Sequence, residues 1–189
     1  MTVQVYLASA SPRRRELLQQ LGYEFQQFSV DADESQFPDE SPTVYVERLA
    51  RLKAQTGVAM GYCDYPVLGS DTVVVIDGQA LGKPKDYADF KNMMTRLSGR
   101  SHQVLTAIAF ATPSTTVSRV VSTEVTFKTL SEAEIAAYWQ SGEPQDKAGG
   151  YGIQGLAGRF VTELKGSYFA VMGLPLNETD ELLSLCQRA

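Results

Sequence analysis

The chain has 189 residues, of which 43% are hydrophobic and 21% are charged, and its formal net charge at pH 7 is −5. This length and composition predict one compact domain spanning residues 1–189, built around one core. The negative charge argues against DNA or RNA as a partner, because nonspecific binding to a phosphate backbone needs many clustered cations.

The sequence also lacks the patterns of a secreted, membrane-spanning, zinc-binding or disulfide-rich protein. The first residues lack the basic and apolar regions of a signal peptide, and no apolar run approaches the length that spans a bilayer. We therefore expect a cytoplasmic protein with no membrane partner. Two widely separated cysteines and a single histidine support neither a zinc site nor a disulfide framework.

The first third of the chain reads as a strand and two helices. Residues 3–8 predict a short buried strand. Ser11 with Pro12 begins a helix that ends before Gly22, and Ser41 with Pro42 begins a second one that reaches about Gly57. The leucines that the first helix turns inward are Leu17, Leu18 and Leu21.

The middle of the chain predicts a central hairpin followed by a helix. Residues 67–76 are rich in β-branched residues and lead through the turn dipeptide Asp77 and Gly78 into a strand at 79–81. Asp86 can cap a helix that ends before Gly99. The apolar face of that helix consists of Phe90, Met93, Met94 and Leu97.

The last part of the chain returns to strands. Residues 104–111 and 117–127 predict two strands joined by a polar turn, and Ser131 with Glu134 forms a capping box for a helix. A glycine-rich loop follows, then strand candidates at 159–164 and 168–171 and a last helix after Pro175. We therefore predict an α/β domain with a mixed, twisted central sheet flanked by helices.

Three arginines lie in the first turn of the first helix. Arg13, Arg14 and Arg15 are disfavoured there by the helix dipole, so an anion is expected to compensate them. A small-residue turn at residues 8–11 and free helix amides would suit a phosphate. A solvated basic surface is the alternative, and this segment alone does not decide between the two.

Two charged residues fall at positions that otherwise read as buried. Lys53 shares a helix face with Val46 and Leu49, so it either reaches the surface at the helix end or points into an anion site. Asp71 interrupts an apolar strand, where it would act as a general base or bind a divalent cation. A structural aspartate bonded to backbone amides is the alternative for Asp71.

Other polar residues have weaker signals. Asp33 and Glu34 lie in a polar loop and carry the oxygen ligands that magnesium or manganese prefers. Lys83 follows the hairpin and can reach a phosphate, or it can lie on the surface. We favour a structural role for His102 over one as general base. Gln154 can read the edge of a base, unless its loop is a mobile surface turn.

Five segments in order along the chain resemble the Maf family of nucleoside triphosphate pyrophosphatases. They are LASASPRRRELL at 7–18, GSDTVV at 69–74, LGKP at 81–84, LSG at 97–99 and DKAGGYGIQG at 146–155. Several separated motifs in the right order are far more specific than one. The resemblance implies a fold similar to the inosine triphosphate pyrophosphatases with a nucleotide cleft, a divalent metal cation (Mg²⁺ or Mn²⁺) and, in many members, a homodimer.

The resemblance also assigns roles to individual residues. Asp71 matches the proton acceptor, and Arg13, Thr72 and Gln154 match the positions that mark the branch acting on dTTP and UTP. The segments that line the nucleotide cleft contribute Ser9, Arg14, Glu34, Lys53, Lys83 and Lys147. A metal is expected near Asp71 and Glu34. Gly150 departs from the alanine common at its position, which loosens the loop without changing the chemistry.

The expected reaction is attack of water on the α-phosphate of dTTP or UTP, which releases the monophosphate and pyrophosphate. Two alternatives stand beside it. One is the same chemistry on 7-methyl-GTP, which the Arg13, Thr72 and Gln154 set disfavours. The other is a nucleotide-binding regulator of cell division and septum formation, which would bind nucleotides without turnover.

Overall fold

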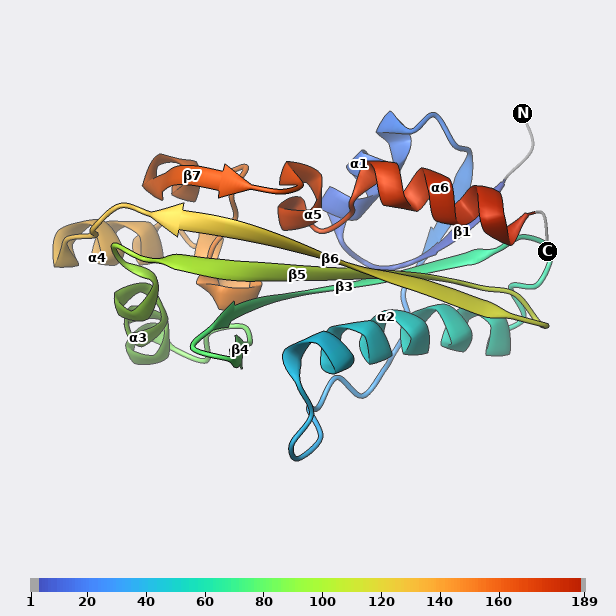
Figure 1. The fold of residues 1–189 in the computed structure, drawn as a ribbon, viewed down its shortest axis with the longest axis horizontal. Helices are drawn as coiled ribbons and strands as arrows, with labels where there is room; N and C mark the ends of the chain where they lie inside the picture. The colour runs from blue at the N-terminus through green and yellow to red at the C-terminus, as the bar shows by residue number, and fades with distance from the viewer. Residues whose placement is uncertain (1–3, 188–189) are drawn as a thin grey trace.

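The computed structural model describes residues 4–187, and its centre is a seven-stranded mixed sheet. The strand order is β2-β1-β3-β5-β6-β7, with β4 paired to β3 beside this path. β1 runs parallel to β2 and to β3, whereas all the other pairs are antiparallel. Figure 1 shows the three long strands β3, β5 and β6 side by side along the long axis of the molecule.

The strands are β1 (Val5–Ala8), β2 (Phe25–Phe28), β3 (Val67–Ile76), β4 (Gln79–Leu81), β5 (Ser101–Ala111), β6 (Thr116–Phe127) and β7 (Val161–Lys165). The α-helices are α1 (Pro12–Gln20), α2 (Pro42–Ala59), α3 (Tyr87–Leu97), α4 (Glu132–Gln140), α5 (Tyr168–Met172) and α6 (Leu176–Cys186). Three short 3₁₀ helices, η1 (Glu143–Asp146), η2 (Ala148–Gly150) and η3 (Leu156–Phe160), lie between α4 and β7. None of the helices in residues 4–187 is both long and apolar enough to cross a membrane.

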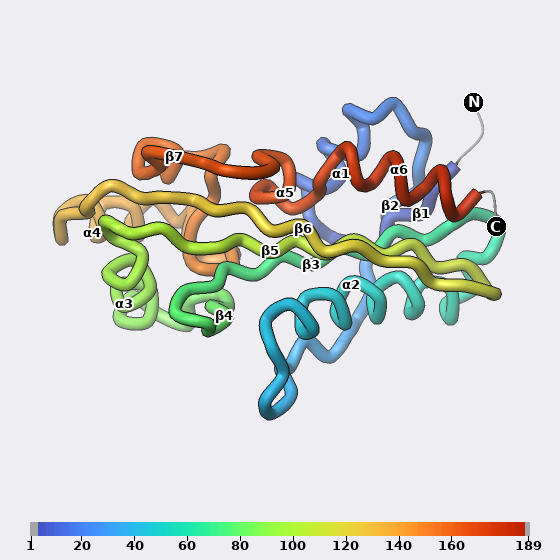
Figure 2. Tube along the Cα trace, in the orientation of Figure 1, coloured from blue at the N-terminus to red at the C-terminus, as the bar shows by residue number. Residues whose placement is uncertain are grey.

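The two faces of the sheet carry different side chains, because successive residues of a strand point to opposite sides. On β5, Ile108 and Phe110 pack with leucines of α1 and α6. Ala107 and Ala109 face α2 instead. Figures 1 and 2 show α2 along one face of the long strands and α6 on the opposite side.

Helix α2 packs very close to β3 at Gly69. A Cβ atom at Gly69 would overlap the carbonyl oxygen of Ala50 and lie 2.6 Å from the Ala54 amide nitrogen. Only a glycine allows two backbones to approach so closely. This contact sets how far α2 stands from the strand that carries Asp71.

Most of the predicted elements are confirmed, and the expected α/β class with a mixed sheet is correct. β3 and β4 have the predicted ends, Asp86 caps α3, and the Ser131 and Glu134 capping box begins α4. Val3, the first residue of the predicted strand at 3–8, lies outside the described residues, and the strand begins at Val5. β5 begins at Ser101, earlier than predicted, and α2 ends at Ala59, two residues later.

Two expectations about the chain are wrong, and one strand was missed. The segment 168–171 is helical, because Ser167 caps α5 through a bond from the Ala170 amide and Gly173 ends it in the left-handed region. Residues 159 and 160 belong to η3, so β7 begins at Val161. The edge strand β2 was not predicted.

Candidate active site

The edge of β3 has a gap between its two neighbours. β1 pairs with β3 at Val67 and Leu68, and β4 pairs with it from Val74 to Ile76. Within the described chain, residues 69–73 therefore have no strand partner on this edge. The gap lies beyond the carboxyl end of β1, a usual place for ligands in sheets with parallel strands. Asp71 and Thr72 lie in it.

Asp71 faces α2, where it meets the buried lysine. The Nζ atom of Lys53 lies 2.7 Å from Oδ1 of Asp71 and 2.7 Å from Oε1 of Glu34. The side chains of Lys53 and Asp71 are only 11% and 13% exposed, whereas that of Glu34 is 50% exposed. The lysine thus points inward to two counter-charges and does not extend to the surface, and Glu34 is the solvent-facing member of the three.

The field around Glu34 is positive. Partial burial opposes its ionisation, but the hydrogen bond and charge of Lys53, with the charges of Lys83 and Arg14, hold the pKa of Glu34 below its usual value. Burial lowers the pKa of Arg14 and its neighbour Arg13 lowers it further, while Asp71 and Glu34 oppose this. Three cations, Lys53, Lys83 and Arg14, therefore act on Glu34, although the whole chain is acidic.

Thr72 points to the other face of the sheet and supports Arg14. The Nη2 atom of Arg14 donates to Thr72 Oγ1 at 3.3 Å, and its Nε donates to the Gly173 carbonyl at 2.9 Å. Thr106 Oγ1 donates to the Ala170 carbonyl at 2.6 Å, so Thr72 must be the donor in the 2.9 Å bond between the two threonine hydroxyls. The guanidinium is held by this chain of bonds.

The turn before α1 and the first turn of this helix carry the remaining N-terminal candidates. Ser9 is buried, and its hydroxyl accepts a bond from the Ser11 amide at 3.2 Å, while Ser11 caps the helix. Arg13 interacts electrostatically with Arg14 and Asp146, whereas Arg15 is exposed. The three arginines therefore do not act together, because successive helix residues point in different directions.

The loop that carries Gln154 is held in place by hydrogen bonds to the carboxylate of Glu143. Glu143 accepts from the Tyr138 hydroxyl at 2.8 Å and from the Leu156 amide at 3.0 Å, and the same hydroxyl accepts from the Gly152 amide at 3.1 Å. Lys147 donates to the Glu143 carbonyl and to Asp146, both at 2.8 Å. Gln154 itself is exposed on this support.

His102 is a structural neighbour of the same loop. Its Nε2 lies 2.6 Å from the Tyr151 hydroxyl, and the ring packs against Phe127. Burial lowers the pKa of His102 to about 4, so the ring is neutral at physiological pH. This geometry agrees with the structural role that we favoured.

The metal expectation depends on two carboxylates. Glu34 and Asp71 converge on one cationic atom, Lys53 Nζ. Asp33 is exposed and accepts the Ser35 amide at 2.9 Å instead. No group of three potential ligand residues occurs within residues 4–187, so these residues alone offer no closed metal cage. Two carboxylates that leave further positions for phosphate oxygens match how Mg²⁺ is held beside nucleotides.

Sequence reasoning missed the residues that support this site. Thr106 belongs to the chain of hydrogen bonds that holds Arg14, and Tyr138 with Glu143 holds the Gln154 loop. The carbonyl of Gly173 also binds Arg14, but the residue type gives no sign of a contact made by a backbone atom. The polar Thr106 within the apolar run of β5 was the clearest available sign.

Comparison with known proteins gives a consistent picture. A family model described as Maf-like protein matches residues 4–186. A dTTP/UTP pyrophosphatase of Pseudoalteromonas translucida is 74% identical over 183 residues, which cover 97% of both chains. Proteins of the same name from Aliivibrio fischeri and Vibrio cholerae are 59% and 58% identical; the alignments cover 97% of this chain and 98% of each relative. A HAM1 protein from Coxiella burnetii, 16% identical, shares the fold with a TM-score of 0.52 over the whole of both chains.

Proposed function

The chain belongs to the Maf family, and we propose that it is a nucleoside triphosphate pyrophosphatase that hydrolyses dTTP and UTP to the monophosphate and pyrophosphate. The names of the relatives that are 58% to 74% identical support the substrate class. The observation that carries the proposal is the meeting of Lys53, Asp71 and Glu34 at the open edge of β3.

The cations bind the triphosphate in this proposal. Arg13 and Arg14 approach from the start of α1, Lys83 follows β4 on the other side of the gap, and Lys53 rises from α2. Their charges offset the acidity of the chain at the place where a polyanion must enter. Arg14 is pre-oriented by Thr72 and Gly173, so little reorganisation is needed when phosphate binds.

Asp71 is the proposed general base. One of its carboxylate oxygens contacts Lys53, which leaves the other for a water molecule in line with the α-phosphate. Pyrophosphate is then the leaving group, and no covalent intermediate forms. Glu34 and Asp71 would hold a divalent cation, Mg²⁺ or Mn²⁺, jointly with the phosphates. When bound, the cation supplies charge neutralisation at the phosphate oxygens.

Base selection is assigned to the Gln154 loop. The Gln154 amide can both donate and accept, as needed to pair with the O4 and N3 edge of uracil or thymine. Thr72 has a different role, because its hydroxyl already bonds Arg14 and Thr106. We assign it to the phosphate side of the site. Ser9 and Lys147 support the loops on either side.

We also propose a cytoplasmic homodimer that uses no nucleic acid or membrane partner. The acidic net charge supports the absence of nucleic-acid binding. Light scattering coupled to size exclusion should give twice the mass of one 20.7 kDa chain, and a monomeric mass would contradict the dimer.

Hydrolysis in H₂¹⁸O tests the site of attack. The proposal predicts that dTTP yields one labelled oxygen in the monophosphate and none in pyrophosphate, because water attacks the α-phosphorus. Label in pyrophosphate, or release of inorganic phosphate with a nucleoside diphosphate, would overturn the mechanism. A reaction without enzyme provides the background exchange.

A further inference from the structure

The loop that carries Glu34 has little support of its own. Residues 29–36 form no helix or strand, and residues 33–39 are all exposed. A groove of about 580 Å³ separates part of this loop from the outer surface of α2, with Phe37, Val44 and Leu52 in its lining. Core packing therefore does not hold Glu34 in place.

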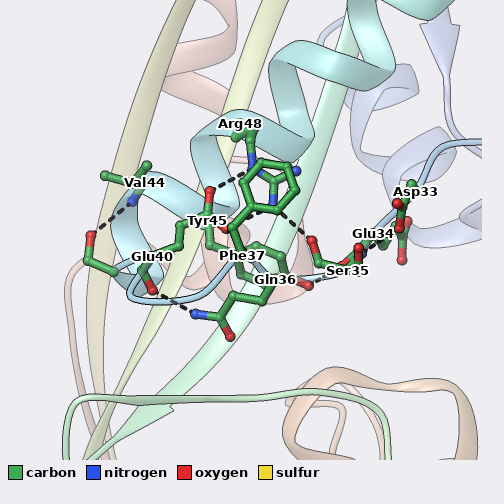
Figure 3. Close-up of polar contacts among 10 residues, drawn as sticks. Asp33, Glu34, Ser35, Gln36, Phe37, Glu40, Val44, Tyr45 and Arg48 are labelled. Atoms are coloured by element: carbon green, nitrogen blue, oxygen red, sulfur yellow. Dashed lines mark hydrogen bonds and ion pairs between the residues drawn. The ribbon is translucent and has the colours of Figure 1, made fainter.

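Arg48 joins the loop to α2. Its Nε and Nη2 atoms donate to the two carboxylate oxygens of Glu40 at 2.6 and 2.8 Å, and Nη2 also donates to the Ser35 carbonyl at 2.9 Å. The guanidinium carbon lies 3.9 Å from the centre of the Phe37 ring. Figure 3 shows Arg48 between Glu40 and the backbone next to Glu34.

These contacts are partly withdrawn from solvent. The Glu40 side chain is 5% exposed and that of Arg48 is 24% exposed. Bidentate pairs between arginine and carboxylate fix geometry as well as charge, and burial reduces their screening. The pair is therefore a stronger anchor than an ordinary surface ion pair.

Tyr45 adds a second anchor from the same helix. Its hydroxyl donates to the Glu34 carbonyl at 2.7 Å. Tyr45 binds the backbone carbonyl of Glu34 and Arg48 binds that of Ser35, so both contacts leave the Glu34 carboxylate free of α2 at these two positions. That carboxylate can exchange its contact with Lys53 for one with a cation or a phosphate-bound water while the loop stays in position.

We propose that Arg48, assisted by Tyr45, is a positioning residue for Glu34 that holds its loop against α2 so that the carboxylate faces Lys53 and Asp71. The inference rests on the proposed function, because only that function gives Glu34 a role in catalysis. Because Tyr45, Arg48 and Lys53 all lie on α2, one rigid helix sets the spacing between the loop and the buried lysine.

The test compares Arg48→Ala and Arg48→Lys with Arg119→Ala. Arg119 also pairs with a carboxylate, Glu181 at 2.6 Å, but it lies on β6 and its partner lies on α6. Wild type and variants are examined by hydrogen exchange of residues 31–41, by binding of Mn²⁺ alone, and by turnover of dTTP over a range of Mn²⁺ concentrations.

Arg48→Ala should speed exchange at the Ser35 and Phe37 amides, which the ordered loop protects through Asp33 and Glu40. The Mn²⁺ concentration for half-maximal turnover should rise ~10-fold, the lower end for residues that orient metal ligands, while kcat at saturating Mn²⁺ changes much less. Arg48→Lys should fail to rescue either effect, because an ammonium cannot make the paired hydrogen bonds that a guanidinium makes with a carboxylate. Arg119→Ala should match wild type.

Unchanged exchange in the loop and an unchanged Mn²⁺ requirement in Arg48→Ala would overturn the inference, as would full rescue by lysine. A lower melting temperature together with a lower kcat at saturating Mn²⁺ would also overturn it, because both would follow from a general loss of structure. If wild type turns over no nucleotide, the proposed function fails, and the exchange and Mn²⁺-binding data still decide whether Arg48 holds the loop.

Discussion

In the proposed mechanism Thr72 acts through Arg14 and does not contact the substrate itself. The hydroxyl passes a hydrogen bond from Arg14 to Thr106, which is itself bonded to a backbone carbonyl. In such a chain each bond polarises the next, and the loss of one member leaves the others unsatisfied. Thr72 and the Gly173 carbonyl together fix the direction of the guanidinium.

Thr72→Val should therefore lower kcat/KM by ~10-fold for every nucleotide, because about 1.4 kcal/mol is the usual scale for such a bond. Valine keeps the shape of threonine, so the strand should be undisturbed. Steady-state kinetics with dTTP and GTP will measure the effect. A change in the ratio between the two substrates would mean that Thr72 reads the base directly.

His102 makes the stability of the protein depend on pH. Its ordinary pKa is 6.5, and burial lowers it to about 4 in the folded state. The unfolded chain therefore takes up the proton first, so the contribution of neutral His102 is complete above pH 6.5 and is lost as the pH falls towards 4.

Replacement by glutamine should flatten this part of the pH profile. His102→Gln can keep a bond to Tyr151 but does not titrate, so its free energy of unfolding should fall by about 3 kcal/mol less than that of wild type between pH 7 and 4. Urea unfolding at several pH values gives the comparison. Parallel curves for the two proteins would show that His102 does not carry this linkage.

At the scale of elements, the site depends on the distance between α2 and β3. Lys53 comes from the helix and Asp71 from the strand, and the two elements touch at Gly69, two residues before Asp71. Interiors are packed too densely to absorb a new methyl group where two backbones already meet. A change at Gly69 should therefore separate the charged pair.

Gly69→Ala should cost about 1–3 kcal/mol of folding free energy, the usual range for overpacking, and should also lower kcat/KM. Gly82→Ala is the matched control for stability, since a Cβ there meets nothing within 4 Å. Its effect should stay within about 0.5 kcal/mol. Equal stability of the two variants would show that the contact between α2 and β3 can relax.

At the scale of the whole molecule, local patterns predicted most of the fold. The β-branched run ending in Asp77 and Gly78 specified β3 and β4, and Ser131 with Glu134 specified the start of α4. Residues 168–171 were misassigned because a short apolar run has no period long enough to separate helix from strand. Only the Ser167 cap and Gly173 decide that segment.

The candidate site was predictable in part for the same reason. Lys53 and Asp71 stood out because each is charged at an apolar position, a property of the local sequence. Glu34 was a candidate from its polar loop and from the family resemblance, but its contact with Lys53 and the contact of Arg48 with the Ser35 carbonyl cross an irregular segment. No periodicity encodes such contacts, so they became visible only in three dimensions.

The central claim concerns which nucleotides are cleaved, and pyrophosphate release tests it most directly. Release is measured from dTTP, UTP, CTP, GTP and 7-methyl-GTP with Mg²⁺ or Mn²⁺, in wild type and in Asp71→Asn. We predict metal-dependent release that favours dTTP and UTP and falls by roughly a hundredfold or more in the variant, as expected for loss of a general base. Similar release from GTP and dTTP, wild-type activity in the variant, or nucleotide binding without any release would contradict the account.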